Sequence, residues 1–141
     1  MTVPVALLRL SWPPKPLWQN RRYHWRAHSE AVAAYRQEAW VAALQQNIRR
    51  LNTDAPELEF DFYPPDSRMR DVHIKPATMK AAIDGIANAM GCDDAKFRCV
   101  WPQAWGEVTK GGCVLVMVTP PADTWQHIAD AARAMVQGSI K

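Results

Sequence analysis

The chain has 141 residues, of which 48% are hydrophobic and 22% are charged. These values are typical of one globular domain with a real core, and they exclude a disordered chain. The net charge of +3 permits a polyanionic partner without establishing one. No apolar run approaches the roughly 20 residues that cross a bilayer, and residues 3–12 lack the features of a signal peptide, so neither a membrane protein nor a secreted one is expected.

The first half of the chain predicts a strand, an irregular segment, a helix and a second strand. Residues 3–10 are apolar on both faces, which predicts a buried strand that ends before the first proline pair. Prolines make residues 12–28 irregular. Ser29 is the expected N-cap of an amphipathic helix that ends near Arg50. Apolar residues alternate with acidic ones at 57–62, which predicts a half-buried strand.

A second helix is expected to start at Pro76, since proline is tolerated in the first helical turn. An apolar stripe continues to Met90, and Gly91 is a natural stop signal. Lys80 and Asp84 are one turn apart and fall off this stripe, so they can face a site or solvent.

The last third of the chain predicts two strands, a turn and a helix. Residues 97–101 alternate as a half-buried strand, and the apolar run at 113–118 is best explained by a central strand. The glycines of residues 108–112 suit a tight turn between them. A final helix is expected within 121–137. The whole chain, 1–141, is therefore predicted to be one α+β domain, with a mixed sheet of about four strands and helices packed on one side.

Several kinds of chemistry are not indicated by the sequence. The chain has an odd number of cysteines, and none of them has CxxC spacing: Cys92, Cys99 and Cys113. This favours reduced thiols in the cytoplasm over disulfides or a zinc site. The serines lie in no GxSxG context, and no cysteine has an evident histidine partner. No phosphate-binding glycine motif occurs, so a nucleotide cofactor is not expected.

Two aspartates are the principal candidates for a metal site. Magnesium takes oxygen ligands and keeps several waters, so two or three carboxylates suffice. Asp71 and Asp94 flank opposite ends of the helix predicted at 76–90, so a segment running back across that helix is required to join them. The alternative is that Asp94 caps a turn and Asp71 pairs with a neighbouring arginine. Spacing alone favours the alternative.

His73 and Lys80 are candidates to assist these aspartates. In an extended segment His73 points to the same face as Asp71, as two ligands of one ion would. A structural or exposed histidine is the alternative. Lys80 could neutralise charge on a scissile phosphate or orient the attacking water. Its alternative is a solvated helix residue that pairs with Asp84.

Basic residues near these candidates could contact a DNA backbone. Arg68, Arg70 and Lys110 are the residues in question, and a solvated surface charge is the alternative for each. Asp66 and Asp93 are acidic neighbours that we expect to tune the site or cap a turn.

In their order and spacing, these segments resemble the RusA family of Holliday-junction resolvases, which is typical of bacteriophages and prophages. The likeness covers most of residues 5–119, and a helix at 121–137 extends beyond the usual family end. No single segment is specific. The segments that carry the likeness are LSWPP at 10–14, Asn20 with Tyr23–Arg26, the Ser29 helix with Tyr35–Arg36, PPDSRMRD at 64–71, KAAIDGIANAM at 80–90, DDAKF at 93–97 and VTKGG at 108–112.

The resemblance implies a small α+β homodimer in the bacterial cytoplasm that cuts four-way DNA junctions with Mg²⁺, for which Mn²⁺ is a possible substitute. Asp71 matches the first aspartate of the family motif, Lys80 the essential lysine and Asp94 the second aspartate of a paired turn. Arg70 matches a basic position.

The chain departs from the family motif at two positions. His73 stands where the family has a second aspartate, and Ile74 stands where it has an asparagine. A branch of RusA-like phage proteins resembles this form, so His73 is interpreted as a replacement ligand. Ile74 cannot orient a ligand by hydrogen bonding as asparagine would. These departures motivate one alternative, a catalytically weak junction-binding protein. Two others are a nuclease of the same fold acting on flaps or forks, and a small phage assembly or interaction protein whose carboxylates are surface residues.

Overall fold

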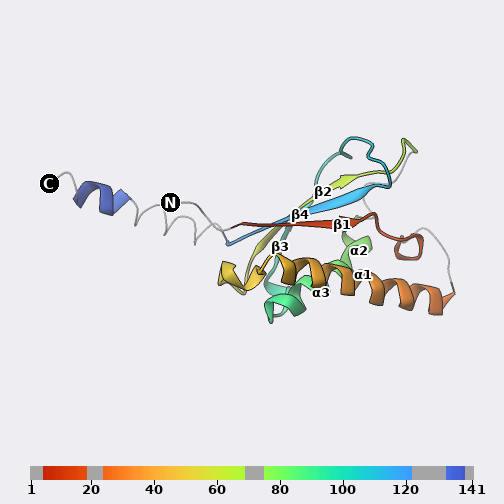
Figure 1. Cartoon of the computed structure of the whole chain (residues 1–141), viewed down its shortest axis with the longest axis horizontal. Coiled ribbons are helices and arrows are strands. Elements are labelled where there is room, and N and C mark those ends of the chain that lie inside the picture. Colours follow the sequence, from red (N-terminus) through yellow and green to blue (C-terminus); the bar gives the residue numbers. More distant parts are fainter. Residues whose placement is uncertain (1–4, 19–23, 69–74, 122–132, 139–141) are drawn as a thin grey trace.

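A computed structural model describes residues 5–18, 24–68, 75–121 and 133–138. Its centre is a four-stranded sheet with the order β1-β4-β2-β3 (Figure 1). β4 runs antiparallel to both β1 and β2, whereas β2 and β3 are parallel. The predicted α+β class with a mixed sheet of about four strands is confirmed. The strands are β1 (Ala6–Ser11), β2 (Glu57–Tyr63), β3 (Arg98–Val100) and β4 (Cys113–Thr119).

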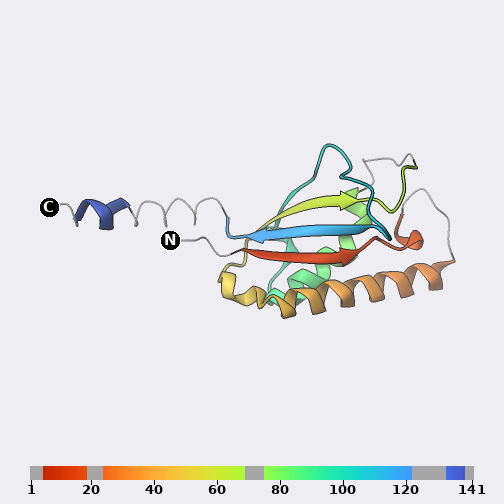
Figure 2. The ribbon, with the colours of Figure 1, turned by 45° about the horizontal axis from the view of Figure 1, so that its top comes forward.

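One face of the sheet forms the core, and helices cover that face (Figure 2). In β2, Leu58, Phe60 and Phe62 are fully buried, while the acidic residues between them point away from the core. This alternation is the one predicted for residues 57–62. β4 lies between β1 and β2, as expected for the apolar run at 113–118.

The prediction of a strand buried on both faces at residues 3–10 is wrong. β1 is an edge strand whose residues alternate between buried and exposed, and Leu7 keeps 53% of its surface exposed. Leu7 lies on the face of the sheet that faces away from the core helices. Apolar residues are common on exposed surfaces, so hydrophobicity alone did not reveal this face.

Helix α1 spans Trp25–Gln45, which corrects the predicted start at Ser29. His24 is the N-cap, and its Nδ1 accepts a hydrogen bond from the Arg26 amide at 3.2 Å. Ser29 is an exposed residue inside the helix. Residues 24–28 contain no proline, so nothing prevents the helix from starting one turn earlier once the histidine satisfies an amide at its end.

The helix predicted to run from Pro76 to Met90 is divided into two. Helix α2 spans Lys75–Thr78 and helix α3 spans Lys80–Met90. Between them Met79 has φ −93° and ψ 0°, a conformation outside the helical range, and its side chain is fully buried. The predicted stop is confirmed, because Gly91 adopts φ 73° and its amide donates to the Ala87 carbonyl at 2.9 Å.

Helices α1 and α3 pack unusually closely at Gly85. A Cβ atom added there would lie 2.3 Å from the Arg36 carbonyl oxygen. Ala39, Ala43 and Ala82 are fully buried in the same core, so small side chains bring the two helices together. This close contact fixes the position of α3, and therefore of the polar residues on its exposed side.

The segment after β3 returns along the end of β2. The Gly106 amide donates to the Phe62 carbonyl near the end of β2 at 2.7 Å. The Thr109 amide donates to the carbonyl of Pro64, which follows β2, at 2.9 Å. The predicted turn at 108–112 is confirmed, since the Gly112 amide donates to Thr109 at 2.8 Å and both turn glycines have positive φ. Residues 133–138 are helical, and the rest of the helix expected within 121–137 lies outside the described residues.

In the described ranges of the chain, no helix is long and apolar enough to cross a membrane.

Candidate functional site

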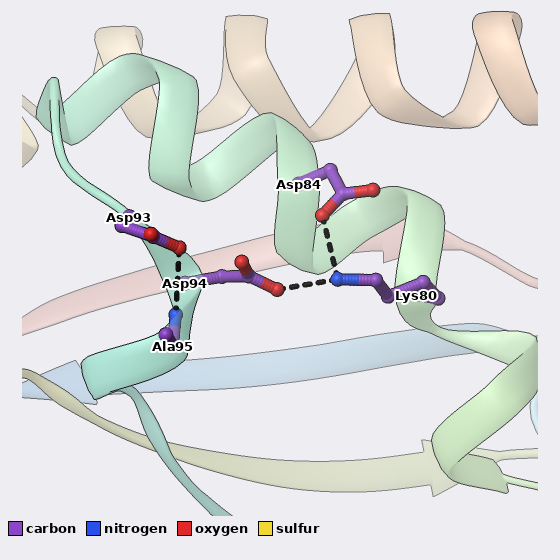
Figure 3. A network of polar contacts seen from close by, with 5 residues as sticks. All are labelled: Lys80, Asp84, Asp93, Asp94 and Ala95. Carbon is purple, nitrogen blue, oxygen red and sulfur yellow. Dashed lines mark hydrogen bonds and ion pairs between the residues drawn. The ribbon is translucent and has the colours of Figure 1, made fainter.

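A lysine and two aspartates converge on the exposed side of α3 (Figure 3). Lys80 is the first residue of α3, and its Nζ donates to Asp84 Oδ1 at 3.0 Å. The same Nζ donates to Oδ2 of Asp94, fourteen residues further along the chain. The ion pair between Lys80 and Asp84, which was the alternative interpretation of Lys80, is therefore formed. It belongs to a larger cluster that also includes the candidate ligand Asp94.

The turn after α3 carries Asp94 back to this cluster. The left-handed Gly91 ends α3, and the 3-10 helix η4 (Asp94–Lys96) follows almost at once. Asp93 caps η4, with its carboxylate accepting from the Ala95 amide at 3.0 Å (Figure 3). The expected capping role of Asp93 is confirmed. The alternative in which Asp94 caps the turn is wrong, because the cap is its neighbour and Asp94 faces Lys80.

The charges in the cluster influence one another. The hydrogen bond from Lys80 holds the pKa of Asp94 below its ordinary value. The bonds from Lys80 to Asp94 and Asp84 raise the pKa of the lysine. The side chains of Lys80, Asp84 and Asp94 are 60%, 38% and 29% exposed, so the cluster is open to solvent. One ammonium faces two carboxylates, and the remaining negative charge favours a cation.

Asp84 and Asp94 together present the hard oxygen donors that Mg²⁺ prefers, and one or two carboxylates are usual for this ion. Among the residues that the structure describes, no group of three or more His, Cys, Asp or Glu side chains could hold a metal ion. The other predicted ligands, Asp71 and His73, lie outside the described residues, as do Arg70 and Ile74. The metal site therefore stays a prediction. Of its three predicted ligands, the structure describes only Asp94.

The remaining basic candidates are exposed. Arg68 forms an ion pair with Asp66 at 3.7 Å, and Asp66 also accepts from the Arg68 amide at 3.0 Å. Asp66 therefore stabilises the turn after β2, as expected of a capping residue. Lys110 is exposed in the glycine turn before β4. Their contact with DNA stays a prediction.

A cleft of about 440 Å³ adjoins the charged cluster. Lys80 and Asp84 of α3 form part of its wall, as does His28 of α1. His28 could not be recognised from sequence, because its position depends on the earlier start of α1 and on how α1 crosses α3. A second depression, of about 500 Å³, lies near the C-terminal end of α3 beside Arg49, Asp54 and Cys92, and its described walls contain none of the predicted site residues.

The chain is similar to a bacterial protein over most of its length. No protein-family model matches the chain. An uncharacterized protein of Xylella fastidiosa (strain Temecula1 / ATCC 700964) is 36% identical over 115 residues, which cover 79% of this chain and 74% of that protein. This chain and the Xylella protein belong to one family. The family therefore includes a bacterial protein.

Proposed function

We propose that the protein is a metal-dependent DNA endonuclease of the RusA type that cuts four-way junctions. The observation that supports this most strongly is the contact between Lys80 and Asp94. The resemblance marks these two positions as an essential lysine and a metal ligand. A helix and a turn separate them in the sequence. If both residues belong to one site, they must nevertheless lie in contact, as they do here.

In this proposal Asp94, Asp71 and His73 would hold Mg²⁺, with Mn²⁺ as a possible substitute. When bound, the ion would stabilise negative charge that develops on the scissile phosphate. The hydrogen bond from Lys80 lowers the pKa of Asp94, which favours the ionised carboxylate that a cation requires. Its 60% exposed side chain can also approach a phosphate oxygen, to which an ammonium donates a strong hydrogen bond.

The proposed substrate and assembly follow from the resemblance. Arg68, Arg70 and Lys110 would contact phosphates and so position the DNA, while branch shape would decide where it is cut. A homodimer would present two such sites to a junction with approximate twofold symmetry, which would give paired nicks. The proposed location is the cytoplasm of a bacterial cell, with the protein encoded by a phage or prophage.

The proposal is tested with a four-way junction incubated in Mg²⁺ or Mn²⁺. We expect the wild type to cut it, and Asp71→Asn and Asp94→Asn to lower the rate by at least two orders of magnitude while binding persists. Asp54→Asn is the matched control, because Asp54 also forms an ion pair with a lysine, Lys96, at 2.8 Å. It should cut at the wild-type rate.

Substrates of different shape distinguish the alternatives. Equal amounts of junction, flap and linear duplex at one salt concentration would show whether a flap or fork is preferred. A wild-type protein that binds the junction and leaves it intact in both metals would be a junction-binding protein. Full activity of Asp94→Asn would refute the site.

A further inference from the structure

The cleft beside the charged cluster is lined by apolar as well as polar residues, and phosphodiester cleavage at Lys80 does not require the apolar ones. It lies where α1 faces α2 and α3, and it has a volume of about 440 Å³. Volumes of this size are typical of sites for small organic groups. Because Lys80 and Asp84 belong to both the cleft and the charged cluster, a group in the cleft would lie directly beside the reacting phosphate.

The walls of the cleft combine apolar and polar groups. Leu17 and Ala81 are 7% and 5% exposed, and Val32 is half-buried, so they give the cleft an apolar floor. His28 lies at an exposed position on its rim, together with Lys80. An apolar floor with a few polar groups at its rim suits a flat ring that has apolar faces and polar edges.

The charge beside the cleft disfavours an anionic occupant. Lys80 is already shared by Asp84 and Asp94, so the carboxylates outnumber the ammonium there. A free phosphate would meet net negative charge unless a cation came with it. A neutral ring would not be repelled in this way, and the ring nitrogens of His28 can form hydrogen bonds to its edge.

We propose that this cleft binds one unpaired nucleobase of the DNA strand that is cut. The inference rests on the proposed function and deepens it, because it names a feature of the substrate. A base and its own phosphate are joined through one sugar, so a base in the cleft positions that phosphate near Lys80. A duplex must unpair and unstack a base to fill the cleft, whereas a branch point presents bases that are more easily released. The cleft thus selects branched DNA.

The test uses a four-way junction with 2-aminopurine at the branch point, mixed with the full-length protein in Mg²⁺ in a stopped-flow instrument, so that fluorescence is read before the strands are cut. The fluorescence of 2-aminopurine rises when the base leaves the stack, and the cleft has no tryptophan in its described walls. We expect a severalfold rise with the wild type. Ala77→Phe would fill the cleft from its exposed wall and should remove at least four-fifths of that rise. His28→Ala should remove part of it.

Ala33→Phe is the matched control, since Ala33 is exposed on α1 and is not part of the cleft. It should keep the full rise, and circular dichroism should show the same helix content in both phenylalanine variants. A bound junction with no rise, or an equal rise with Ala77→Phe, would overturn the cleft proposal even if the wild type cuts the junction. A rise without any cutting in Mg²⁺ or Mn²⁺ would instead support the cleft and contradict the nuclease. Failure to bind the junction would overturn both.

Discussion

In the proposed site, Lys80 would compete with a metal ion for the carboxylate of Asp94. Its Nζ donates to Asp94 and to Asp84, and it adds a positive charge where a divalent cation would bind. Lys80→Met removes this charge while keeping a long side chain. We expect Mn²⁺ to bind the variant severalfold more tightly, since a repulsive charge close to the ion is lost. Cleavage should nevertheless fall by about two orders of magnitude, the scale of losing one stabilising donor.

The same variant has a spectroscopic signature. The hydrogen bond from Lys80 lowers the pKa of Asp94, so the carboxyl should titrate at higher pH in Lys80→Met than in the wild type. Carbon-detected NMR of the aspartate carboxyl groups would measure both titrations. An unchanged Asp94 titration, or weaker Mn²⁺ binding by the variant, would contradict the assigned role of Lys80.

Tyr35 connects α1 to the edge strand β1. Its hydroxyl donates to the Ser11 carbonyl at 2.8 Å, and the Ser11 hydroxyl donates to Glu38 at 2.9 Å. Tyr35→Phe leaves the ring in place and removes one hydrogen bond. We expect the free energy of unfolding at pH 7 to fall by about 1 kcal/mol. Urea unfolding followed by circular dichroism measures this difference.

The alkaline limit of stability should change in the same variant. Burial raises the pKa of Tyr35 well above its ordinary value, whereas in the unfolded chain a tyrosine loses its proton near pH 10. Above about pH 10 the folded state therefore holds more protons than the unfolded state, and stability falls as pH rises. The raised pKa values of Lys80 and Lys96 act in the same direction. Tyr35→Phe should show a shallower loss between pH 9 and pH 11, and an identical slope would contradict this account.

The polar residues of α3 could be predicted from sequence, but their partner could not. Lys80 and Asp84 fall off the apolar stripe by simple helical periodicity. The contact with Asp94 depends on the left-handed turn at Gly91 and on the short helix η4, which together reverse the chain. Spacing describes positions within one element, so it did not reveal a contact made across a turn.

At the scale of elements, the contact between α1 and α3 depends on Gly85. Alanine in place of a helical glycine normally stabilises a helix by about 1 kcal/mol. Here the added Cβ would lie 2.3 Å from the Arg36 carbonyl oxygen, a backbone atom that cannot move without shifting α1. We therefore expect Gly85→Ala to lower the free energy of unfolding by about 1–3 kcal/mol, as other overpacked cores do.

Gly138 provides a control for this prediction. It lies in the C-terminal helical segment at 133–138, and an added Cβ there would meet no heavy atom within 4 Å. Gly138→Ala should leave the melting temperature unchanged or slightly higher. A Gly85→Ala protein as stable as the wild type would show that the two helices can separate at no cost.

Element types were predictable where hydrophobic periodicity and glycine signals agreed. The acidic-apolar alternation of β2, the apolar run of β4 and the stop at Gly91 were all identified from sequence. The start of α1 was missed because a histidine serves as its N-cap, a role more typical of serine, asparagine or aspartate. The break at Met79 was missed because Met79 continues the apolar stripe of the predicted helix, and no glycine or proline lies between Ala77 and Lys80.

At the scale of the whole molecule, the fold class was predictable and the pairing of strands was not. Composition and element order indicated one α+β domain with a mixed sheet. The placement of β4 between β1 and β2, and the parallel pairing of β3 with β2, bring together segments far apart in sequence. These pairings position the segments on either side of α3, and the proposed site depends on them.

The central claim is that Asp71 and His73 meet Asp94 around one ion. A crystal structure of the protein soaked in Mn²⁺, with anomalous scattering recorded to locate the metal, tests it most directly. We expect an anomalous peak about 2.0–2.3 Å from a carboxylate oxygen of Asp71, a carboxylate oxygen of Asp94 and a ring nitrogen of His73. Lys80 should then have moved away from Asp94. A metal bound at Asp54 instead, or Asp71 and His73 lying far from an Asp94 that binds no ion, would contradict the account.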